Sequence, residues 1–474
     1  MKPVAIVGGG ITGLTAAFRL RQKGIPVTLY EASERVGGVI QSLQRDGYLA
    51  EFGPNTILET SPKVASLVED LGLAARRLYS DPAANNRYLV RHGRVIKMPE
   101  SALGLMMTPL FSPAAKLRLL LEPFIPPSDP AREESVADFV CRRLGREFLD
   151  YAIDALVGGI YAGDPQKLSV PQAFPKLYAL EQKYGSLIKG QILGARERKK
   201  SAEVAKPNAK KLSFDEGLQV LPDTLRAQLG DDIRLRAPVN KLMQREQDWV
   251  VNSAAQPAGA EHSAVVYAAT AFGLSEMEIA TRRPIQVLSL ADIRYPPVAS
   301  VVLGFKRKDV EHPLNGFGML IPRVEGFNIL GTIFSSSLFP GRAPKGCVTL
   351  TSYLGGERAP EMAQKSREEL FAITRQDLRR LLGVLGQPTF QHHVVYPRAI
   401  PQYELGYARF KQVMSAAETD APGLFFAGHY REGISVSDCI VSGHEVAERV
   451  ALFLKNNQTS PDMSAAGAQA EVRA

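Results

Sequence analysis

The chain has 474 residues, of which 45% are hydrophobic and 22% are charged, and its formal net charge is +8. This length predicts two or three lobes rather than one simple core, and the ordinary composition excludes a fibre and a disordered chain. Three widely spaced cysteines without a CxxC pair, and the lack of eighteen consecutive apolar residues, argue against a disulfide framework, a zinc site and a spanning helix.

The first predicted elements form a βαβ unit with parallel strands. Residues 3–7 are typical of a buried strand, residues 11–23 of a helix, and residues 25–31 of a second strand. Gly8, Gly10 and Gly13 fit the spacing GxGxxG between the first strand and the helix. These glycines allow a tight turn, a close backbone approach to a pyrophosphate and close helix packing, so we expect a dinucleotide at the start of this helix.

A carboxylate and a second glycine pair refine this prediction. Glu31 ends the second strand, where it suits ribose hydroxyls and repels a 2′-phosphate, which disfavours NADP. Arg35, Gly37 and Gly38 follow in "ASERVGG" and add a cation and close-approach positions beside the same pyrophosphate. A permanently bound cofactor needs this second layer, so FAD is favoured over NAD.

The later elements follow in chain order. We expect a helix over 61–73 with Ser61 as N-cap, two short helices in the proline-broken stretch 102–127, mostly helix over 135–195, a strand meander over 232–270 ("RLRAPVNKLMQ", "WVVNSA", "SAVVYAAT"), a sheet over 298–354, an amphipathic helix over 364–386, the strand "GLFFAG" (423–428), and a last helix over about 436–454. The start of the last helix, near Asp438, would suit the edge of a flavin ring that becomes negative on reduction.

Two segments allow two interpretations each. The basic stretch 195–211 is either a solvated surface loop or a contact for anionic lipid or an acidic partner; nucleic acid fits poorly because aromatic residues do not interleave with the charges. The apolar stretch 102–127 is either a patch that lies on a membrane face or a helical cap over a pocket, and both can hold.

The sequence resembles the flavin amine-oxidase superfamily and, within it, the oxygen-dependent protoporphyrinogen oxidases, with the plant-type branch most similar in pattern. The superfamily pattern is an N-terminal GxGxxG, an ExxxRxGG continuation and a C-terminal GxFFAG strand with its helix. The more specific blocks span about residues 3–453: "EFGPNTI" (51–57), "NNRYLVRHG" (85–93), "VGGIYAGDPQKLS" (157–169), "SFDEGLQVLPDTL" (213–225), "PLNGFGMLIP" (313–322), "LGTIFSSSLFPGRAP" (330–344) and "GISVSDCIVSG" (433–443).

The resemblance implies an α/β fold with a Rossmann-like FAD-binding domain, a mixed-sheet substrate domain and a helical membrane or cap domain. The implied segments are FAD-binding at 1–80, 211–285 and 401–454, helical at 81–210, substrate-binding at 286–400, and a flexible tail at 455–474. The implied FAD-binding residues are Gly8, Gly9, Gly10, Ile11, Thr12, Gly13, Glu31, Ala32, Arg35, Gly37, Gly38, Gly53, Pro54, Asn55, Thr56, Val239, Gly428, Val436, Ser437 and Asp438.

The implied substrate is a flexible, oily tetrapyrrole with propionates, which needs an apolar slot and few charges. Arg87 would hold a propionate, Leu320 and Ile333 would sandwich a ring, and Tyr353 stands where phenylalanine or methionine is usual, so its hydroxyl needs a partner if buried. The remaining implied substrate contacts are Phe317, Asn55 and the carbonyl of Gly159.

The implied reaction is hydride transfer from a bridging methylene carbon to FAD with loss of a pyrrole N–H proton, repeated three times, with dioxygen as the final acceptor and hydrogen peroxide as product. No residue is assigned as a base, because the flavin does the difficult step. Coproporphyrinogen III oxidation, amine or carotenoid oxidation, and a non-catalytic tetrapyrrole-binding flavoprotein stay open as alternatives. A cytoplasmic protein, peripheral on the cytoplasmic membrane face and forming a homodimer, is expected.

Overall fold

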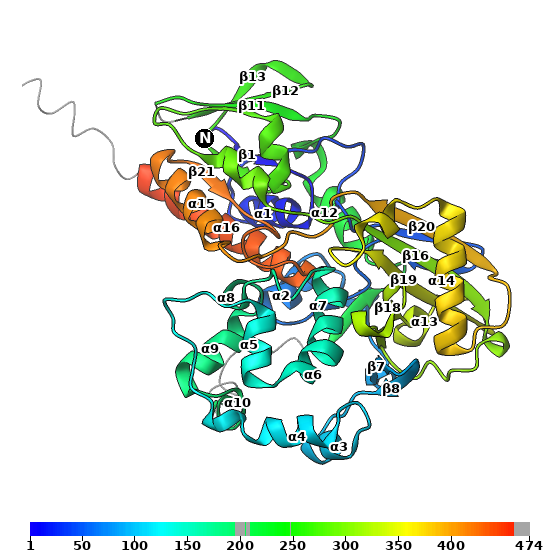
Figure 1. The fold of residues 1–474 in the computed structure, drawn as a ribbon. Coiled ribbons are helices and arrows are strands. Elements are labelled where there is room, and N and C mark those ends of the chain that lie inside the picture. Colours follow the sequence, from blue (N-terminus) through cyan, green and yellow to red (C-terminus); the bar gives the residue numbers. More distant parts are fainter. Residues whose placement is uncertain (195–203, 205–208, 247, 459–474) are drawn as a thin grey trace, which may run out of the picture. The chain divides into compact units, whose positions relative to one another are not determined.

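The computed structural model describes residues 1–194, 204, 209–246 and 248–458, which form two compact units (Figure 1). Unit 1 comprises Met1–Gly38, Leu221–Asp292 and the described residues from Lys411 onward. Unit 2 comprises Val39–Val220 and Ile293–Phe410 within the described residues. The basic segment 195–211 lies almost wholly outside the described residues, apart from 204 and 209–211.

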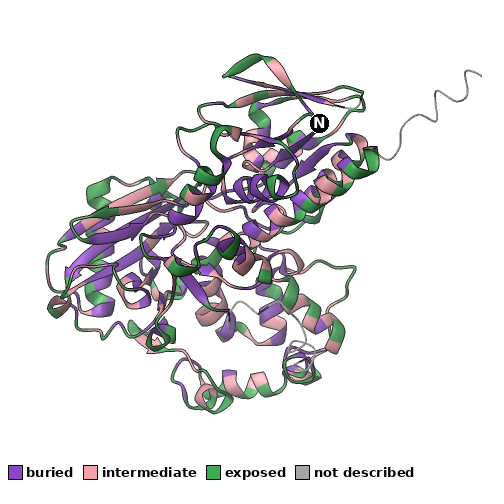
Figure 2. Cartoon of the chain, turned by 180° about the vertical axis from the view of Figure 1, so that it is seen from behind, coloured by how far each residue is buried: buried purple, intermediate pink, exposed green. Residues whose placement is uncertain are grey.

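Unit 1 contains a five-stranded sheet in the order β10-β2-β1-β14-β21, and all of its pairings are parallel. The central strands are apolar on both faces, as expected where helices and loops cover both faces of a parallel sheet. The bounds are β1 (Val4–Val7), β2 (Val27–Tyr30), β10 (Ile233–Arg234), β14 (Ala264–Tyr267) and β21 (Leu424–Phe426). Both β1 and β14 are buried along their whole length (Figure 2).

Two helices of this unit, α1 (Ile11–Gln22) and α16 (Val436–Gln458), pack side by side (Figure 1). Gly443 makes the close approach possible, because a Cβ atom there would lie 2.5 Å from the Thr12 carbonyl oxygen. The other helices that belong mostly to this unit are α12 (Val220–Leu229) and α15 (Ala408–Asp420), and α15 was not predicted.

The predicted loose tail from 455 is wrong for its first residues, because α16 continues through 455–458. No proline or glycine interrupts this stretch, and Lys455 in the last turn is favourable at the negative end of the helix dipole. The rest of the predicted tail, 459–474, lies outside the described residues.

The second sheet of unit 1 has the order β13-β12-β11-β15 and corrects the predicted meander. Its strands are β11 (Val239–Gln244), β12 (Trp249–Ser253), β13 (Gln256–His262) and β15 (Glu278–Ala280). The stretch "SAVVYAAT" instead supplies β14 of the parallel sheet, where its apolar side chains are buried on both faces. "RLRAPVNKLMQ" is also split, since its first residue ends β10 and its second half forms β11.

Unit 2 is built on a seven-stranded mixed sheet in the order β20-β16-β19-β18-β17-β7-β8. One face is buried under α14, through contacts such as those of Leu370 and Leu378 with the strand residues Val301 and Leu350. The bounds of its strands are β7 (Arg87–Arg91), β8 (Arg94–Lys97), β16 (Val298–Lys306), β17 (Gly318–Leu320), β18 (Ile329–Ile333), β19 (Cys347–Gly355) and β20 (Phe390–Tyr396). The predicted helix over 364–386 is α14 (Arg367–Leu382), which a Ser366 capping box starts and Gly383 ends.

Two small sheets and a helical region complete unit 2. The sheets are β3 (Ser42–Arg45) with β4 (Tyr48–Glu51), and β5 (Ile57–Leu58), β9 (Lys211–Phe214) and β6 (Arg77–Tyr79) in the order β5-β9-β6. The helices are α2 (Pro62–Asp70), α3 (Ala102–Met107), α4 (Pro113–Leu120), α5 (Val136–Arg143), α6 (Arg146–Phe148), α7 (Asp154–Tyr161), α8 (Val170–Ala173), α9 (Pro175–Tyr184), α10 (Leu187–Leu193) and α13 (Ser335–Leu338).

Two local predictions in this region are confirmed. Ser61 caps α2 by accepting a hydrogen bond from the Lys63 N–H, and the stretch 102–127 forms the short helices α3 and α4. None of the helices in the described residues combines the length and apolar character that crossing a bilayer requires.

Candidate cofactor and substrate sites

Three glycines of the loop between β1 and α1, Gly8, Gly10 and Gly13, have different structural roles. Gly8 has a φ of +108°, and a Cβ there would lie 2.7 Å from the Ala269 backbone nitrogen. A Cβ at Gly13 would collide with the Gly8 carbonyl oxygen, so this glycine lets α1 sit directly on the loop. Gly10, in contrast, borders open space within 4 Å of its built Cβ. The loop therefore leaves an open backbone face at the position where GxGxxG proteins approach a pyrophosphate.

The N-terminus of α1 offers donors to an anion. Gly10 is its N-cap in extended conformation, and among the described residues no side chain caps this end and no acidic residue occupies its first turn. The first N–H groups of a helix have no partner within the helix and carry partial positive charge. Open space at Gly10 and uncapped donors together fit the pyrophosphate of a dinucleotide.

Glu31 organises this loop. One carboxylate oxygen accepts a 2.7 Å hydrogen bond from the Gly9 N–H, and the other accepts a 2.8 Å bond from the Ser33 N–H. The Ala237 N–H donates to the Glu31 carbonyl over 2.9 Å, which brings the start of β11, with Val239, beside the loop. Glu31 thus connects two of the three segments of unit 1 that are predicted to hold the nucleotide, the glycine loop and the start of β11.

Arg35 holds the second glycine pair in place. Its guanidinium donates to the carbonyl oxygens of Val36 (3.1 Å) and Gly38 (2.7 Å), while the Gly37 N–H donates to the Gly9 carbonyl over 2.8 Å. The neighbouring Ala32 is exposed. Arg35 therefore fixes the loop that lies against Gly9 and Gly10, in addition to the charge it brings to this region.

The start of α16 joins the start of α1. The Thr12 hydroxyl donates to the Cys439 carbonyl over 3.2 Å. Asp438 accepts from the Ser435 N–H (3.1 Å) and its own N–H donates to the Ser435 hydroxyl (3.2 Å), which caps the helix at both positions. Four more of the predicted cofactor residues lie here. Ile11 and Ser437 are buried, Val436 is half-buried, and the Gly428 N–H donates to the Ser442 hydroxyl.

In unit 2, the sheet register brings the predicted substrate residues onto one face. Two rows of direct cross-strand neighbours, two residues apart along each strand, cross β7, β17, β18 and β19. The first row is Arg87, Gly318, Ile333 and Thr351, and the second is Leu89, Leu320, Gly331 and Tyr353. Because side chains alternate between the two faces of a strand, Arg87, Leu320, Ile333 and Tyr353 share the face opposite α14. This face has a cation at one side and apolar side chains across three strands.

The hydroxyl of Tyr353 has the partners that its burial requires. It donates to the Gly53 carbonyl over 3.0 Å and accepts from the Asn55 amide over 2.7 Å, and burial raises the pKa of its phenol. The Ser335 hydroxyl donates to the side-chain amide oxygen of Asn55 over 3.3 Å. The loop 53–56, which includes Pro54 and Thr56, is thus fixed to the substrate face of unit 2, whereas the glycine loop belongs to unit 1.

Gly159 and Phe317 border the same face. A Cβ at Gly159 in α7 would lie 2.3 Å from the Leu320 Cδ2, so any larger residue here would have to displace the Leu320 side chain. Phe317 packs near Ile333, and its N–H donates to the Asn86 carbonyl over 2.8 Å, beside Arg87.

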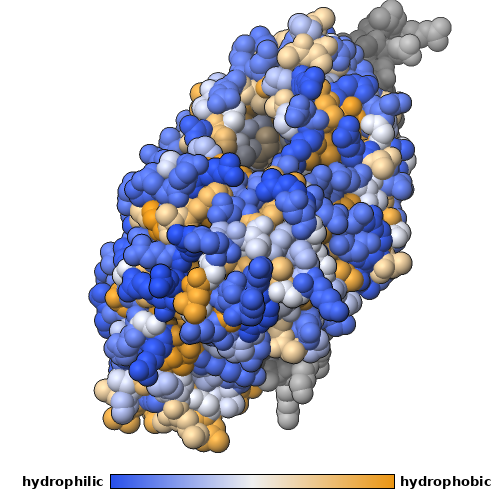
Figure 3. All heavy atoms as spheres, turned by 90° about the vertical axis from the view of Figure 1, so that its right-hand side faces the viewer, coloured by the Kyte–Doolittle hydropathy of each residue, from blue (hydrophilic) through white to orange (hydrophobic). Residues whose placement is uncertain are grey.

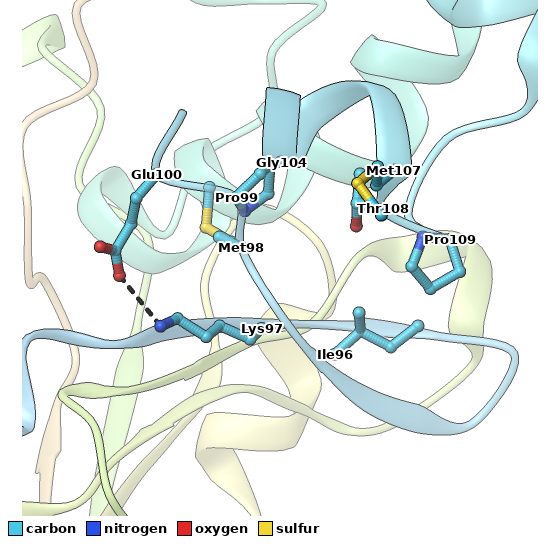
Figure 4. A pocket seen from close by; sticks show the side chains of 9 residues that line it. All are labelled: Ile96, Lys97, Met98, Pro99, Glu100, Gly104, Met107, Thr108 and Pro109. Atoms are coloured by element: carbon cyan, nitrogen blue, oxygen red, sulfur yellow. Dashed lines mark ion pairs between the residues drawn. The ribbon is translucent and has the colours of Figure 1, made fainter. Parts of the chain in front are cut away.

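One surface pocket of about 430 Å³ lies elsewhere in unit 2, between β8 and α3 (Figure 4). Met98, Met107 and Pro109 line it, and an ion pair of 3.3 Å between Lys97 and Glu100 lies at one end. None of the predicted substrate or cofactor residues lines this pocket. This pocket is an open recess beside the apolar helix α3.

Two groups near the substrate face were not singled out by sequence reasoning. Glu51 is buried, accepts from the Ser42 hydroxyl (2.6 Å) and the Leu218 N–H (2.9 Å), and lies 3.9 Å from Arg342; burial raises its pKa to about 7. Lys211 was grouped with the basic segment, yet only 8% of it is exposed. The signal that could have identified it is its place at the head of the apolar strand "KLSF".

Comparisons with known proteins identify the family of this chain. The model of the flavin-containing amine oxidoreductase family matches residues 11–451. Protoporphyrinogen oxidase 2 of Arabidopsis thaliana is 36% identical over 98% of this chain and 97% of its own length. Coproporphyrinogen III oxidase of Bacillus subtilis (strain 168) is 30% identical over 96% of this chain and 98% of its own. A crystal structure of a protein from Exiguobacterium sp. 255-15 superposes with a TM-score of 0.80 at 24% identity, covering 95% and 99% of the chains.

The structural similarity confirms the predicted α/β fold class, and the family match confirms the predicted resemblance and a flavin cofactor, FAD. The residues of unit 1 fit such a cofactor through the open face at Gly10 and the uncapped end of α1. The chain is an oxidoreductase of the flavin-containing amine oxidoreductase family.

Proposed function

We propose that this protein oxidises protoporphyrinogen IX to protoporphyrin IX, with three molecules of dioxygen reduced to hydrogen peroxide. The full-length similarity to a protoporphyrinogen oxidase carries the proposal. The substrate face of unit 2 supports it, because the face combines one cation with apolar side chains from three strands. A tetrapyrrole with propionates at one edge needs this combination.

The roles of the residues follow from their chemistry. Arg87 would pair with a propionate through its guanidinium fork, and its position beside Gly318 leaves room above the strand. Leu320 and Ile333 would hold the macrocycle flat, and Gly159 keeps α7 close enough to narrow the slot. When bound, FAD would act as the acceptor of the hydride. The protein binds, orients and shields the substrate, which accelerates the reaction by positioning.

Residues of the loop 53–56 give this face its rigidity. Tyr353 and Asn55 share a hydrogen bond and both contact Gly53, so the polar edge of the slot does not depend on substrate for its shape. We assign no side chain as base. The proton lost from the pyrrole nitrogen would leave through solvent at the open side of the slot.

Coproporphyrinogen III is the second candidate substrate, because a coproporphyrinogen III oxidase is 30% identical over nearly the whole chain. An amine oxidase needs an aromatic cage, and the single tryptophan, Trp249, is instead buried in β12 with its N–H donated to the Pro422 carbonyl over 3.2 Å. Aerobic incubation with each porphyrinogen, followed by porphyrin fluorescence, tests the assignment. Faster oxidation of coproporphyrinogen would replace the first proposal by the second, and no oxidation of either would refute both.

We also infer that the apolar helices of unit 2 lie on a membrane surface. At least half of each of these side chains is exposed to solvent: Leu103, Met107, Leu117, Leu120, Leu121, Phe124, Ile192 and Leu193. Hydrophobic residues gather at the lower end of Figure 3, the end at which Figure 1 shows α3 and α4. Exposed apolar patches of this kind are typical of membrane or protein contact sites.

The patch is held rigid from below. Glu122 is fully buried and accepts from the Leu187 N–H (2.8 Å), the Ser186 hydroxyl (2.5 Å) and the Arg143 guanidinium (3.2 Å). These bonds join the end of α4 to the start of α10, so that Phe124 belongs to a surface fixed by buried charges.

Vesicle sedimentation tests the membrane proposal. Leu117→Ser with Phe124→Ser should lower binding to anionic vesicles by about tenfold or more, because each buried apolar side chain contributes roughly 1.5–3 kcal/mol. The matched control is Leu385→Ser, an equally exposed leucine elsewhere in unit 2. Equal binding of both variants would refute the proposal.

The homodimer stays a prediction.

A further inference from the structure

Lys211 is a buried cation at the head of β9. It is 8% exposed, and its ammonium group donates to the Asn85 side-chain oxygen over 3.1 Å. Among the residues that the structure describes, no carboxylate forms an ion pair with it. Lysine is almost never buried without a partner, because removing an ammonium ion from water costs several kcal/mol. The position of this charge therefore needs an explanation.

The surroundings of Lys211 lead to the predicted carboxylate site. Asn85 lies two residues before Arg87, and the Lys211 ammonium lies 6.0 Å from the centre of the Phe317 ring, which borders the substrate face. Burial lowers the pKa of Lys211, and the positive charge of Arg87 lowers it further. The charge of Arg87 thus adds to the free-energy cost of keeping Lys211 protonated in its buried position.

Arg87 differs from Lys211 in exposure. It is open to solvent, although surrounding protein desolvates its guanidinium enough to lower its pKa. Arg87 is thus an exposed cation on the apolar face, and Lys211 is a buried cation close to Phe317 at the border of that face. Two carboxylates on adjacent rings of one macrocycle would meet one cation each, and protoporphyrinogen IX carries its two propionates on neighbouring rings.

We propose that Lys211 is the second carboxylate-binding residue of this protein and that, with Arg87, it holds the two neighbouring propionates of the porphyrinogen. This inference rests on the proposed function and names the part of the site that recognises the substrate's acidic edge. This role would explain why Lys211 is buried, because a bound carboxylate would supply its counter-ion. The buried charge lowers the stability of the substrate-free protein, which is a common consequence of building a functional site.

The test compares Lys211→Met with wild type on protoporphyrinogen IX and on its dimethyl ester. Methionine keeps the buried volume and removes the charge. We expect the KM for the diacid to rise at least tenfold with kcat within about twofold, and the KM for the ester to stay unchanged, because a charge-assisted hydrogen bond is worth about 1.5–3 kcal/mol, or roughly 10- to 150-fold. Lys211→Arg should restore much of the affinity.

Lys210→Met is the matched control, since Lys210 is exposed and adjacent in the chain. A structural role for Lys211 would lower stability and affect diacid and ester alike. We expect instead that substrate-free Lys211→Met melts at the same temperature as wild type or higher. An unchanged KM for the diacid, or equal losses on diacid and ester, would overturn the inference.

A binding measurement separates this inference from the proposed function. Protoporphyrin IX and its dimethyl ester are titrated with protein, and porphyrin fluorescence anisotropy is followed. If wild type oxidises no porphyrinogen, the proposed function fails, yet preferential binding of the diacid that is lost in Lys211→Met would still support the carboxylate site. If wild type oxidises porphyrinogen but Lys211→Met binds the diacid as wild type does, only the inference fails.

Discussion

The contact between α1 and α16 predicts the effect of one added methyl group. In Gly443→Ala, the new Cβ would lie 2.5 Å from the Thr12 carbonyl oxygen and 2.8 Å from the Thr15 Cβ. Ordinary contacts of this type are 3.4–4 Å long. The two helices would have to separate by about 1 Å, and neither neighbouring atom can rotate away because both are fixed to the α1 backbone.

The size of the effect follows from two opposing contributions. Overpacking a tight contact costs about 1–3 kcal/mol, with the upper end expected here because the neighbour is backbone. Alanine gains about 1 kcal/mol over glycine in helix propensity. The free energy of unfolding of unit 1 should therefore fall by about 2 kcal/mol, which lowers the melting temperature by about 4–8 °C for a unit of this size.

The assay is the temperature at which flavin fluorescence appears as holoprotein releases its cofactor. Gly104→Ala is the matched control. It lies in α3, where the nearest atom is the Ser101 hydroxyl oxygen at 3.2 Å, and a shift of a few tenths of an ångström relieves this contact, so the gain in helix propensity should prevail. Gly443→Ala should melt lower than wild type, and Gly104→Ala at the same temperature or higher. A Gly443→Ala protein as stable as its control would refute the packing argument.

Three further predictions concern single side chains. Glu31→Ala should raise the dissociation constant for FAD about 10- to 100-fold, measured by dialysis, because the Gly9 N–H loses a charged acceptor; full flavin retention would contradict this. Tyr353→Phe should lower the unfolding free energy by about 1–2 kcal/mol in thermal melts, since the Asn55 amide loses its acceptor, and an unchanged melt would argue against that bond. Glu51 has a pKa raised from 4.5 to about 7, so the folded state holds the proton more tightly and Glu51 removes stability as pH rises through that window. The free energy of unfolding of Glu51→Gln should rise relative to that of wild type by at most about 3 kcal/mol between pH 4.5 and 7, with no further rise above pH 7. A difference in unfolding free energy that does not depend on pH would contradict this prediction.

Local sequence patterns determined much of unit 1 and several helix ends. GxGxxG with its flanking strand and helix is a continuous signal, and the same holds for Ser61 before Pro62, whose side chain caps α2 without help from distant residues. The buried side of α16 was also readable from its 3.6-residue period, because Ile440, Gly443 and Ala447 recur on one face. These features depend on neighbours within one or two helical turns.

Pairings between distant segments were not readable in this way. "AVVY" (264–267) follows a strand meander in sequence, yet it pairs with β1 about 260 residues earlier, and an apolar run carries no mark of its partner. Lys211 ends a basic stretch and reads as a surface charge, but β9 pairs with β5 and β6 and so buries its side chain beside Asn85. Local motifs are enough to predict which residues bind a nucleotide, but the burial of Lys211 near Arg87 could not be predicted in this way, because strand pairing over long sequence distances sets which side chains become neighbours.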